Sequence, residues 1–304
     1  MKEFDSDNLF FTWWNTSLAP SAKTRANANQ RNVVYDIINF MINTLNIDFI
    51  ALGEVSEIDI TNIKLNCNLN NHMVVSGIDK AGRSSFDTCY IYNSKKIEFI
   101  GYMNSVIKKN RKTYRLAQKV DIKVVSTDTL MHLFISHWPS RLHYPKDDPE
   151  RHQWGIRLRM IIDEISSLYD NNPYIICMGD YNDEPFDTSI AEHLMATRDR
   201  DLVIQRKALF YNPFWRQLGY TRNKNETELE QSSCGSYYYK NGSITKWHTF
   251  DQIMFSHSFI KYDKWRLDDE SANILCLPGL LDIIKDPNEI FDHLPIITKI
   301  ERVV

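Results

Sequence analysis

The sequence predicts a protein of the α/β class, and three features of the chain lead to that prediction. Residues 9–55 have the pattern of a strand, a helix and a second strand, the order in which helices pack on a sheet. Residues 72–125 hold several short apolar runs separated by turns, as antiparallel hairpins do. Residues 174–180 form a continuous apolar run, which is typical of a strand buried on both faces.

The first elements follow from the spacing of apolar residues. An aromatic-rich run at 9–14 predicts the first strand, and the run FIALGEV at 49–55 predicts the second. Between them we expect a helix over 32–45, because its apolar side chains recur every three or four positions and so share one face. These side chains are Val34, Ile37, Ile38, Met41 and Leu45.

Four further segments complete the expected elements. They are a strand at 130–140, a helix from Asp147 or Asp148 through Pro149 to Leu168, loops with short helices at 198–246, and strands at 247–256 and 292–303. The helix start is expected because an acidic cap followed by proline is a start signal. No internal repeat, low-complexity tract or linker interrupts the chain, so we expect one domain over residues 1–304.

Composition narrows the class of protein. The formal charge of −3 and the pI near 6.3 argue against a protein that coats nucleic acid through bulk charge, so any affinity for phosphate must be local. Five widely spaced cysteines without a CxxC pair predict reduced thiols. The N-terminus lacks the pattern of a signal peptide, and no apolar run has the length of a membrane span. We therefore expect a cytoplasmic protein.

The strongest chemical signal is the run GDYNDEP at 179–185, directly after the apolar strand. Polar residues at a strand end face the cleft of an α/β sheet. Asp180 and Asn182 are two residues apart, so both side chains can reach one point, where they would coordinate a hard cation or hold a phosphate and its attacking water. The alternative is an Asx-turn in which both residues only cap the backbone.

Two more motifs combine a histidine with polar neighbours. Asp292 and His293 stand together before Pro295, which offers either a base with a fixed tautomer or an acidic ligand, although a plain surface turn fits as well. His137 and Arg141 follow another apolar strand, and both can reach a phosphoryl oxygen. A single histidine at such a position is more often structural.

Three further polar residues close or interrupt predicted strands. Glu54 ends the second strand and is the best single candidate for a Mg²⁺ ligand, since Mg²⁺ prefers one or two carboxylates together with water and substrate oxygens. Asn15 ends the first strand, where it can hold the water of a metal or a phosphate. Asp251 interrupts an apolar strand and needs a partner such as His293, because a buried unpaired charge is costly.

Taken in order, these motifs resemble those of the endonuclease/exonuclease/phosphatase family. The resemblance extends from Phe11 to Ile297 and rests on Trp14-Asn15, Gly53-Glu54, Ser136 to Arg141, Gly179 to Asn182, Asp251 and Asp292-His293. It implies a four-layer αββα sandwich of two mixed sheets with helices outside and an active site at one edge. Abasic-site enzymes of this family differ at His137, and they carry an aspartate where this chain has Ser17, which argues against that branch.

The resemblance also implies roles for the residues. Glu54 is expected to bind Mg²⁺, or Mn²⁺ in its place, with Asn15 beside it and Asp292 completing the metal site. His293 is expected to be the base, oriented by Asp251. Asp180 and Asn182 are then expected to position the water and the scissile phosphate, and His137 to stabilise the developing charge. These roles amount to direct in-line attack of water on phosphorus.

The substrate is the least determined part of the prediction. Residues 108–119 carry six positive charges, among which Arg115 is expected to face the cleft, and Arg141 is a second candidate for substrate binding. Trp138, Tyr237 to Tyr239 and Trp247 can supply stacking surfaces for bases. These features favour DNA or RNA cleavage. The alternatives are a phosphomonoesterase or a phosphodiesterase acting on a phospholipid headgroup or small molecule, and a catalytically inactive binding module.

Overall fold

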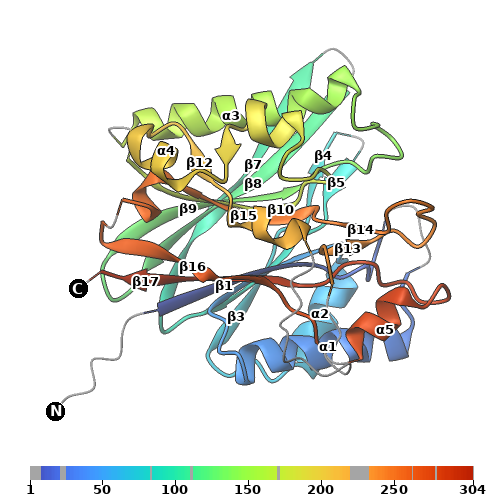
Figure 1. Ribbon diagram of the computed structural model, residues 1–304. Helices are drawn as coiled ribbons and strands as arrows, with labels where there is room; N and C mark the ends of the chain where they lie inside the picture. The colour runs from blue at the N-terminus through green and yellow to red at the C-terminus, as the bar shows by residue number, and fades with distance from the viewer. Residues whose placement is uncertain are drawn as a thin grey trace, which may run out of the picture.

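A computed structural model describes residues 8–20, 25–82, 84–109, 112–169, 172–219, 233–261, 263–277 and 279–303. Its two large sheets lie face to face, and helices cover both outer faces (Figure 1). Helices α1 (Ala28–Asn43), α2 (Glu57–Asn66) and α5 (Leu280–Lys285) lie on one side, and α3 (Pro149–Ser167) and α4 (Arg200–Gln205) on the other. The order of layers is therefore helix, sheet, sheet, helix.

The first sheet contains the first and the last strand of the chain, β1 and β17. Its order is β16-β17-β1-β2-β6-β3, formed by Trp265–Ile274, Ile296–Arg302, Asn8–Asn15, Phe49–Gly53, Cys89–Asn93 and His72–Ser76. Strands β1 and β2 are parallel, with Asn15 opposite Gly53. Because parallel strands end at the same edge, Asn15 and Glu54 emerge side by side.

The second sheet is built around a parallel pair of its own. Its order is β11-β12-β15-β10-β9-β8-β7, formed by Ala196–Thr197, Phe210–Tyr211, Asp251–Ser256, Tyr174–Asp180, Thr129–His137, Lys112–Val124 and Ile97–Lys109. Strands β9 and β10 are parallel, with His137 opposite Asp180, and Asp180 is in turn opposite Asp251 of β15. The strand ends therefore place these three residues at one edge of the second sheet.

Two small hairpins flank the edge where the strands end. They are β4 (Asp79–Ala81) with β5 (Ser84–Phe86), and β13 (Tyr237–Tyr238) with β14 (Trp247–His248). Both lie on the same side of the molecule in Figure 1. Tyr237 also forms an isolated antiparallel bridge with His293.

The apolar pattern explains the layers. Every residue of β10 is buried, as expected for the run YIICMGD. Helix α1 begins earlier than the predicted residue 32, because Asn27 and Gln30 form a capping box, and it buries Val34, Ile38 and Met41 against the first sheet. Helix α3 starts as predicted, with Asp148 capping the N–H of Glu150 and proline following.

Several elements differ from the sequence prediction. Helix α2 and strand β16 were not expected: α2 buries little apolar surface, and β16 carries the polar run DDES at a break in its register with β17. The single strand expected at 247–256 is two strands, because residues 247–248 pair with β13 and residues 251–255 pair with β10. Residues 220–232 of the expected loop region lie outside the described part of the chain.

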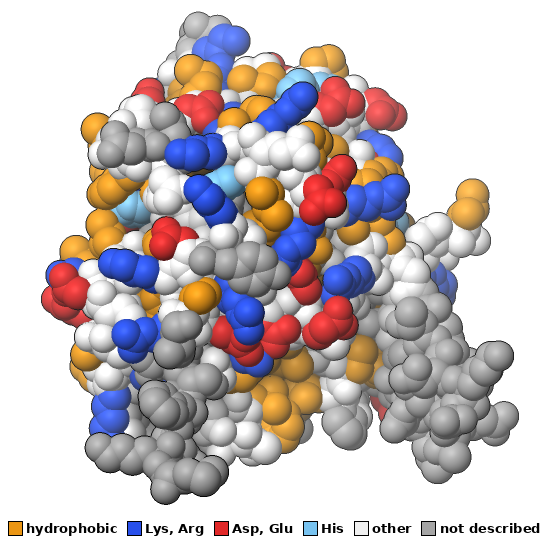
Figure 2. Space-filling model, turned by 60° about the vertical axis from the view of Figure 1, so that its left-hand side comes forward, with side chains coloured by type: hydrophobic (Ala, Val, Ile, Leu, Met, Phe, Trp, Pro, Cys, Tyr) orange, Lys and Arg blue, Asp and Glu red, His pale blue; other side chains and the backbone are white. Residues whose placement is uncertain are grey.

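The surface agrees with the weak net charge. On the face seen in Figure 2, basic and acidic side chains are interspersed, and the described residues there form no continuous basic field. Among the described residues, no helix is both long and apolar enough to cross a membrane. Any strong attraction for a polyanion on this face would therefore have to be local.

Gly179 allows β10 to approach β9 closely, just before Asp180. Its φ is +150°, and a Cβ at this position would lie 1.9 Å from the carbonyl oxygen of Ser136. Gly101 has nearly the same φ, +156°, but a Cβ there would have no atom within 4 Å. The two glycines therefore separate steric contact from backbone strain.

We predict that Gly179→Ala lowers the free energy of unfolding by about 3 kcal/mol more than Gly101→Ala does, because only the first adds a contact that the sheet must move to relieve. Urea denaturation of both variants measures the difference. Equal losses would show that β9 and β10 separate at no cost.

Candidate active site

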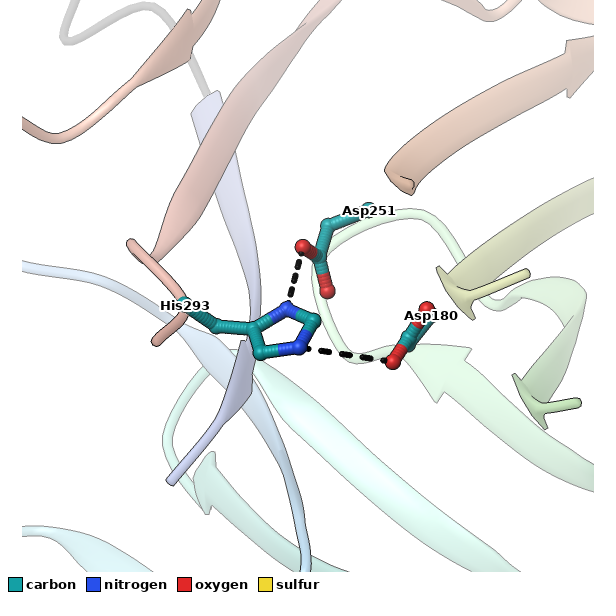
Figure 3. A group of neighbouring side chains, drawn as sticks. All are labelled: Asp180, Asp251 and His293. Carbon is teal, nitrogen blue, oxygen red and sulfur yellow. Dashed lines mark hydrogen bonds and ion pairs between the residues drawn. The ribbon is translucent and has the colours of Figure 1, made fainter. Parts of the chain in front are cut away.

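His293 and Asp251 form a buried pair at the edge of the sandwich where β1, β2, β9 and β10 end. The Nδ1 atom of His293 lies 2.7 Å from Oδ2 of Asp251 (Figure 3). The indole Nε1 of Trp13 donates to Oδ1 of the same carboxylate at 2.7 Å. The Nε2 atom of His293 points toward Asp180, 3.7 Å from its Oδ2. Asp251 thus fixes the ring so that Nε2 faces the second sheet.

Electrostatics around His293 favour its protonated form in the absence of a cation. Burial lowers its pKa, but the carboxylates of Asp251 and Asp180 outweigh burial and raise the pKa to about 10. For Asp180, in contrast, burial raises the pKa, and the nearby carboxylate of Asp251 raises it further. A divalent cation near these carboxylates would counter their charge and lower the pKa of His293 again.

Asp180 and Asn182 adopt the turn and face the site at the same time. Oδ1 of Asp180 accepts the N–H of Asn182 at 2.8 Å, which is the backbone capping of an Asx-turn. Its other oxygen, Oδ2, lies near His293 and 3.5 Å from Nδ2 of Asn15. Asn182 has a φ of +52°, and its Nδ2 donates to the carbonyl oxygen of Trp138 at 3.0 Å. Capping therefore does not consume the whole Asp180 carboxylate.

Arg151, at the start of α3, holds this turn from below. Its guanidinium contacts Oδ1 of Asp183 at 2.6 Å and donates to the carbonyl oxygens of Asn182 and Pro139 at 2.7 and 2.8 Å. The side chain is buried, so both loops of the site are tied to one helix. Sequence reasoning missed Arg151, since a lone arginine in a helix reads as an exposed residue.

His137 has a second carboxylate partner that the sequence prediction also missed. Its Nδ1 lies 3.1 Å from Oδ1 of Asp87, while its Nε2 lies 3.9 Å from both Glu54 Oε1 and Asp180 Oδ2. Burial lowers the pKa of His137, but Asp87 outweighs burial and raises it to about 9. Asp87 directly precedes Thr88 and the apolar strand β6, which was the only available signal.

Glu54, Asp292 and Asn15 supply oxygen donors beside the two histidines. Burial raises the pKa of Glu54, and the carboxylates of Asp292 and Asp87 add to this effect against the opposing influence of His137. Ser17 donates its hydroxyl to Asp292 at 3.0 Å and its N–H to Oδ1 of Asn15 at 3.2 Å. A carboxylate whose pKa is raised by burial and by neighbouring carboxylates, as that of Glu54 is, fits a site for a hard divalent cation.

A second group of possible ligands consists of Asp180, Asp251 and His293, whose ligand atoms lie within 4.8 Å of one another. Both oxygens of Asp251 already accept hydrogen bonds from Trp13 and His293, so Asp251 is better suited to orienting His293 than to binding an ion. Glu54, Asp292 and Asn15 line the cavity described next, whereas Asp251 does not. We therefore favour the Glu54 side for a cation.

A cavity of about 670 Å³ opens where these residues meet. Its lining includes Asn15, Glu54, His137, Asp180, Asn182, Asp292 and His293. The β4–β5 hairpin forms one wall, where the guanidinium of Arg115 bonds the carbonyl oxygen of Ser85 and lies 5.7 Å from the ring centre of Phe86. The cavity therefore brings these seven residues together with two arginines, Arg25 and Arg115.

Some residues proposed for substrate binding have other contacts. Trp138 is buried, packs edge-on against Tyr181 and leaves no exposed face for a base. Trp247 packs on Tyr238 and is partly buried against the core. Arg141 donates to the carbonyl oxygen of Asn182 and pairs with Asp187, so it supports the loop instead of lining the cavity.

Two lysines of the predicted basic run are engaged elsewhere. Lys112 pairs with Glu150 and Lys119 with Asp121. Arg111 lies outside the described residues. Among the described members of the run, Arg115 alone lines the cavity. The basic run as a whole therefore does not form the rim of the site.

Comparison with known proteins identifies the family. The model of the endonuclease/exonuclease/phosphatase family matches residues 47–281. This chain belongs to that family. No curated protein matches the sequence. The expected membership is thereby confirmed, and the matched residues include Glu54, His137, Asp180, Asn182 and Asp251.

Solved structures share the fold of the family at low sequence identity. An endonuclease/exonuclease/phosphatase family protein of Bacteroides thetaiotaomicron has a TM-score of 0.63 and 11% identity, covering 99% of this chain and 100% of its own. TDP2 of D. rerio, complexed with single-strand DNA product, has 0.60 and 14%, covering 96% and 98%. A B. thetaiotaomicron mannosyl-6-phosphatase has 0.58 and 12%, covering 96% and 99%. The predicted four-layer fold is confirmed.

We predict that Asp87→Asn lowers kcat for a phosphate ester by about tenfold to a hundredfold, because His137 loses the charge that holds its ring and its proton. Steady-state kinetics on a chromogenic ester measure the change. The matched control is Asp121→Asn, since Asp121 contacts Nδ1 of His132 at 2.7 Å in the same way but does not line the cavity. Full activity in both variants would exclude the role assigned to Asp87.

Proposed function

We propose that this protein hydrolyses phosphodiester bonds of nucleic acid by direct in-line attack of water, with Mg²⁺ as its cofactor and Mn²⁺ as a possible substitute. The observation that carries the proposal is the buried His293–Asp251 pair, whose free ring nitrogen faces Asp180 in a cavity shared with Glu54 and His137. A base, a charge-stabilising cation and a carboxylate-rich metal site are the parts that this reaction needs.

Glu54 and Asp292, with the amide oxygen of Asn15, are the residues proposed to hold the ion. All three offer hard oxygen donors at the cavity, which suits Mg²⁺ better than a soft metal. When bound there, Mg²⁺ supplies positive charge to the phosphoryl oxygens and to the surrounding carboxylates.

His293 accepts a proton from the attacking water through Nε2, while Asp251 holds Nδ1 and stabilises the resulting imidazolium. Asp180 and Asn182 orient the water and the phosphate. The N–H of His137 Nε2, kept protonated by Asp87, donates to a phosphoryl oxygen as charge develops. A bond forms from the water oxygen to phosphorus as the bond to the leaving oxygen breaks, without a covalent enzyme intermediate.

Nucleic acid is the substrate we favour. The structural neighbour TDP2 contains a DNA product, whereas another neighbour is a mannosyl-6-phosphatase, so the fold accommodates both kinds of ester. The cavity of about 670 Å³ lies within the size range of small-ligand sites and takes one nucleotide, with Arg115 beside it for a neighbouring phosphate. The five free cysteines fit the reducing cytoplasm, where we place the protein.

We expect the wild-type protein to nick supercoiled plasmid in Mg²⁺ or Mn²⁺, and EDTA or His293→Ala to abolish nicking, because base and cation are both required. Gel electrophoresis measures the nicked fraction. Asp251→Asn should reduce the rate strongly while leaving the protein folded, since the amide keeps the shape of the carboxylate.

A phosphodiester and a phosphomonoester of small alcohols are assayed in parallel. An intact plasmid together with metal-dependent turnover of a small ester would replace the nuclease by a phosphatase or a lipid or small-molecule phosphodiesterase. No turnover of any of these substrates by a folded protein would favour a binding module.

A further inference from the structure

An aromatic and cationic surface lies outside the cavity and takes no part in the chemistry above. The rings of Phe186 and Trp215 are 6.0 Å apart at 53°. Lys146 Nζ lies 4.8 Å from the centre of the Phe186 ring, and the guanidinium of Arg198 lies 4.9 Å from the ring of Trp215. We call these four residues the Phe186 patch.

Three of the four residues of the Phe186 patch are exposed, and Trp215 is partly buried. Phe186 is 48% exposed, the side chain of Lys146 is 46% exposed, and Arg198 is exposed as well. An aromatic side chain that stays about half exposed loses part of the hydrophobic free energy that burial would give, which marks such a surface as a candidate binding site. Two rings under two cations, at the surface, are the arrangement that binds an unpaired base together with its phosphate.

Phe186 of the patch lies in the loop after β10, which also carries Asn182. Phe186 follows Asn182 by four residues, so their Cα atoms are separated by at most ~14 Å. Asp187, the next residue, accepts from Arg141 and lies 2.6 Å from Lys146, while Arg141 itself donates to the carbonyl oxygen of Asn182. A single-stranded nucleic acid that leaves the cavity would therefore reach the patch within a few nucleotides.

The loop that forms the cavity rim leads to the same place. Leu142 and His143 line the cavity, and Lys146 follows three residues later. A short segment of chain therefore joins the cavity rim to Lys146 of the patch.

We propose that the Phe186 patch binds single-stranded nucleic acid a few nucleotides from the scissile phosphate, by stacking a base on Phe186 and Trp215 and placing a phosphate near Arg198. This inference rests on the proposed function and narrows its substrate to single strands or single-stranded ends. A duplex keeps its bases stacked on each other and cannot use the rings, so it gains only the weaker cation contacts.

The charges near the patch agree with this choice. Asp187 is paired with both Lys146 and Arg141, so its negative charge is balanced. Arg198 supplies a guanidinium that both stacks on Trp215 and can reach a phosphate. The mixture is too polar for insertion into a lipid surface, which requires a larger apolar area.

The test compares Phe186→Ala and Arg198→Glu with wild type on a single-stranded 10-nucleotide DNA, the same sequence as a duplex, and a small chromogenic phosphodiester. We expect KM for the single strand to rise about tenfold in each variant, the range for losing one stacked base, with kcat unchanged. Turnover of the small diester should stay at the wild-type value, because it does not reach the patch.

Two matched controls lie at the opposite end of the strands. Tyr169→Ala removes an aromatic ring that is 42% exposed after α3, and Lys95→Glu reverses an exposed charge in the turn after β6. Neither should change KM for the single strand. Thermal unfolding of all variants shows that they are folded.

Binding is measured separately from turnover, by fluorescence anisotropy of the labelled 10-nucleotide strand in EDTA. A Kd that rises about tenfold in Phe186→Ala supports the patch even if the wild type cleaves none of the substrates, a result that would overturn only the proposed reaction. An unchanged Kd and KM in both patch variants, or an equal loss for the duplex, would overturn the inference while leaving hydrolysis of the small diester intact.

Discussion

The buried carboxylate of Asp251 is the constraint on which the site depends, because it joins the two sheets. Trp13 donates to it from β1 of the first sheet, Asp251 itself begins β15 of the second, and His293 approaches from the loop before β17. Hydrogen bonds to a charged group contribute about 1.5–3 kcal/mol each, and leaving the charge unpaired costs at least as much. The same hydrogen bonds therefore hold the two sheets together and orient His293, the proposed base.

A second buried ion pair, Arg151 with Asp183, holds the loops after β9 and β10 in place. Arg151 satisfies Asp183 and at the same time closes the free carbonyl oxygens of the loops after β9 and β10. Arg151 donates to four loop carbonyl oxygens, those of Pro139, Tyr144, Tyr181 and Asn182, so its removal would take one hydrogen bond from each of them and a buried ion pair from Asp183. The positive φ of Asn182 is maintained because Arg151 of α3 holds its carbonyl oxygen by a hydrogen bond.

The strand-end residues could be predicted from the sequence, whereas the residues that hold them could not. The end of an apolar run marked Glu54, His137 and Asp180 as candidates, and the resemblance to the family implied that they share one site. Asp87 and Arg151 act through contacts between segments far apart in the chain, which no local pattern reveals. Trp138 misled for the opposite reason: its position beside His137 suggested exposure, but its indole turns inward and donates to Leu116.

The cluster of charges explains why a base and a cation belong together here. Five carboxylates, those of Glu54, Asp87, Asp180, Asp251 and Asp292, surround two imidazole rings, so the negative charges exceed the positive ones even with both rings protonated. The same carboxylates raise the pKa of His293 to about 10, which favours a protonated ring, and a protonated ring cannot accept a proton from water. A divalent cation held on the Glu54 side would counter part of that negative charge and lower the pKa of His293. Metal binding and activation of the proposed base would then be two consequences of one electrostatic balance.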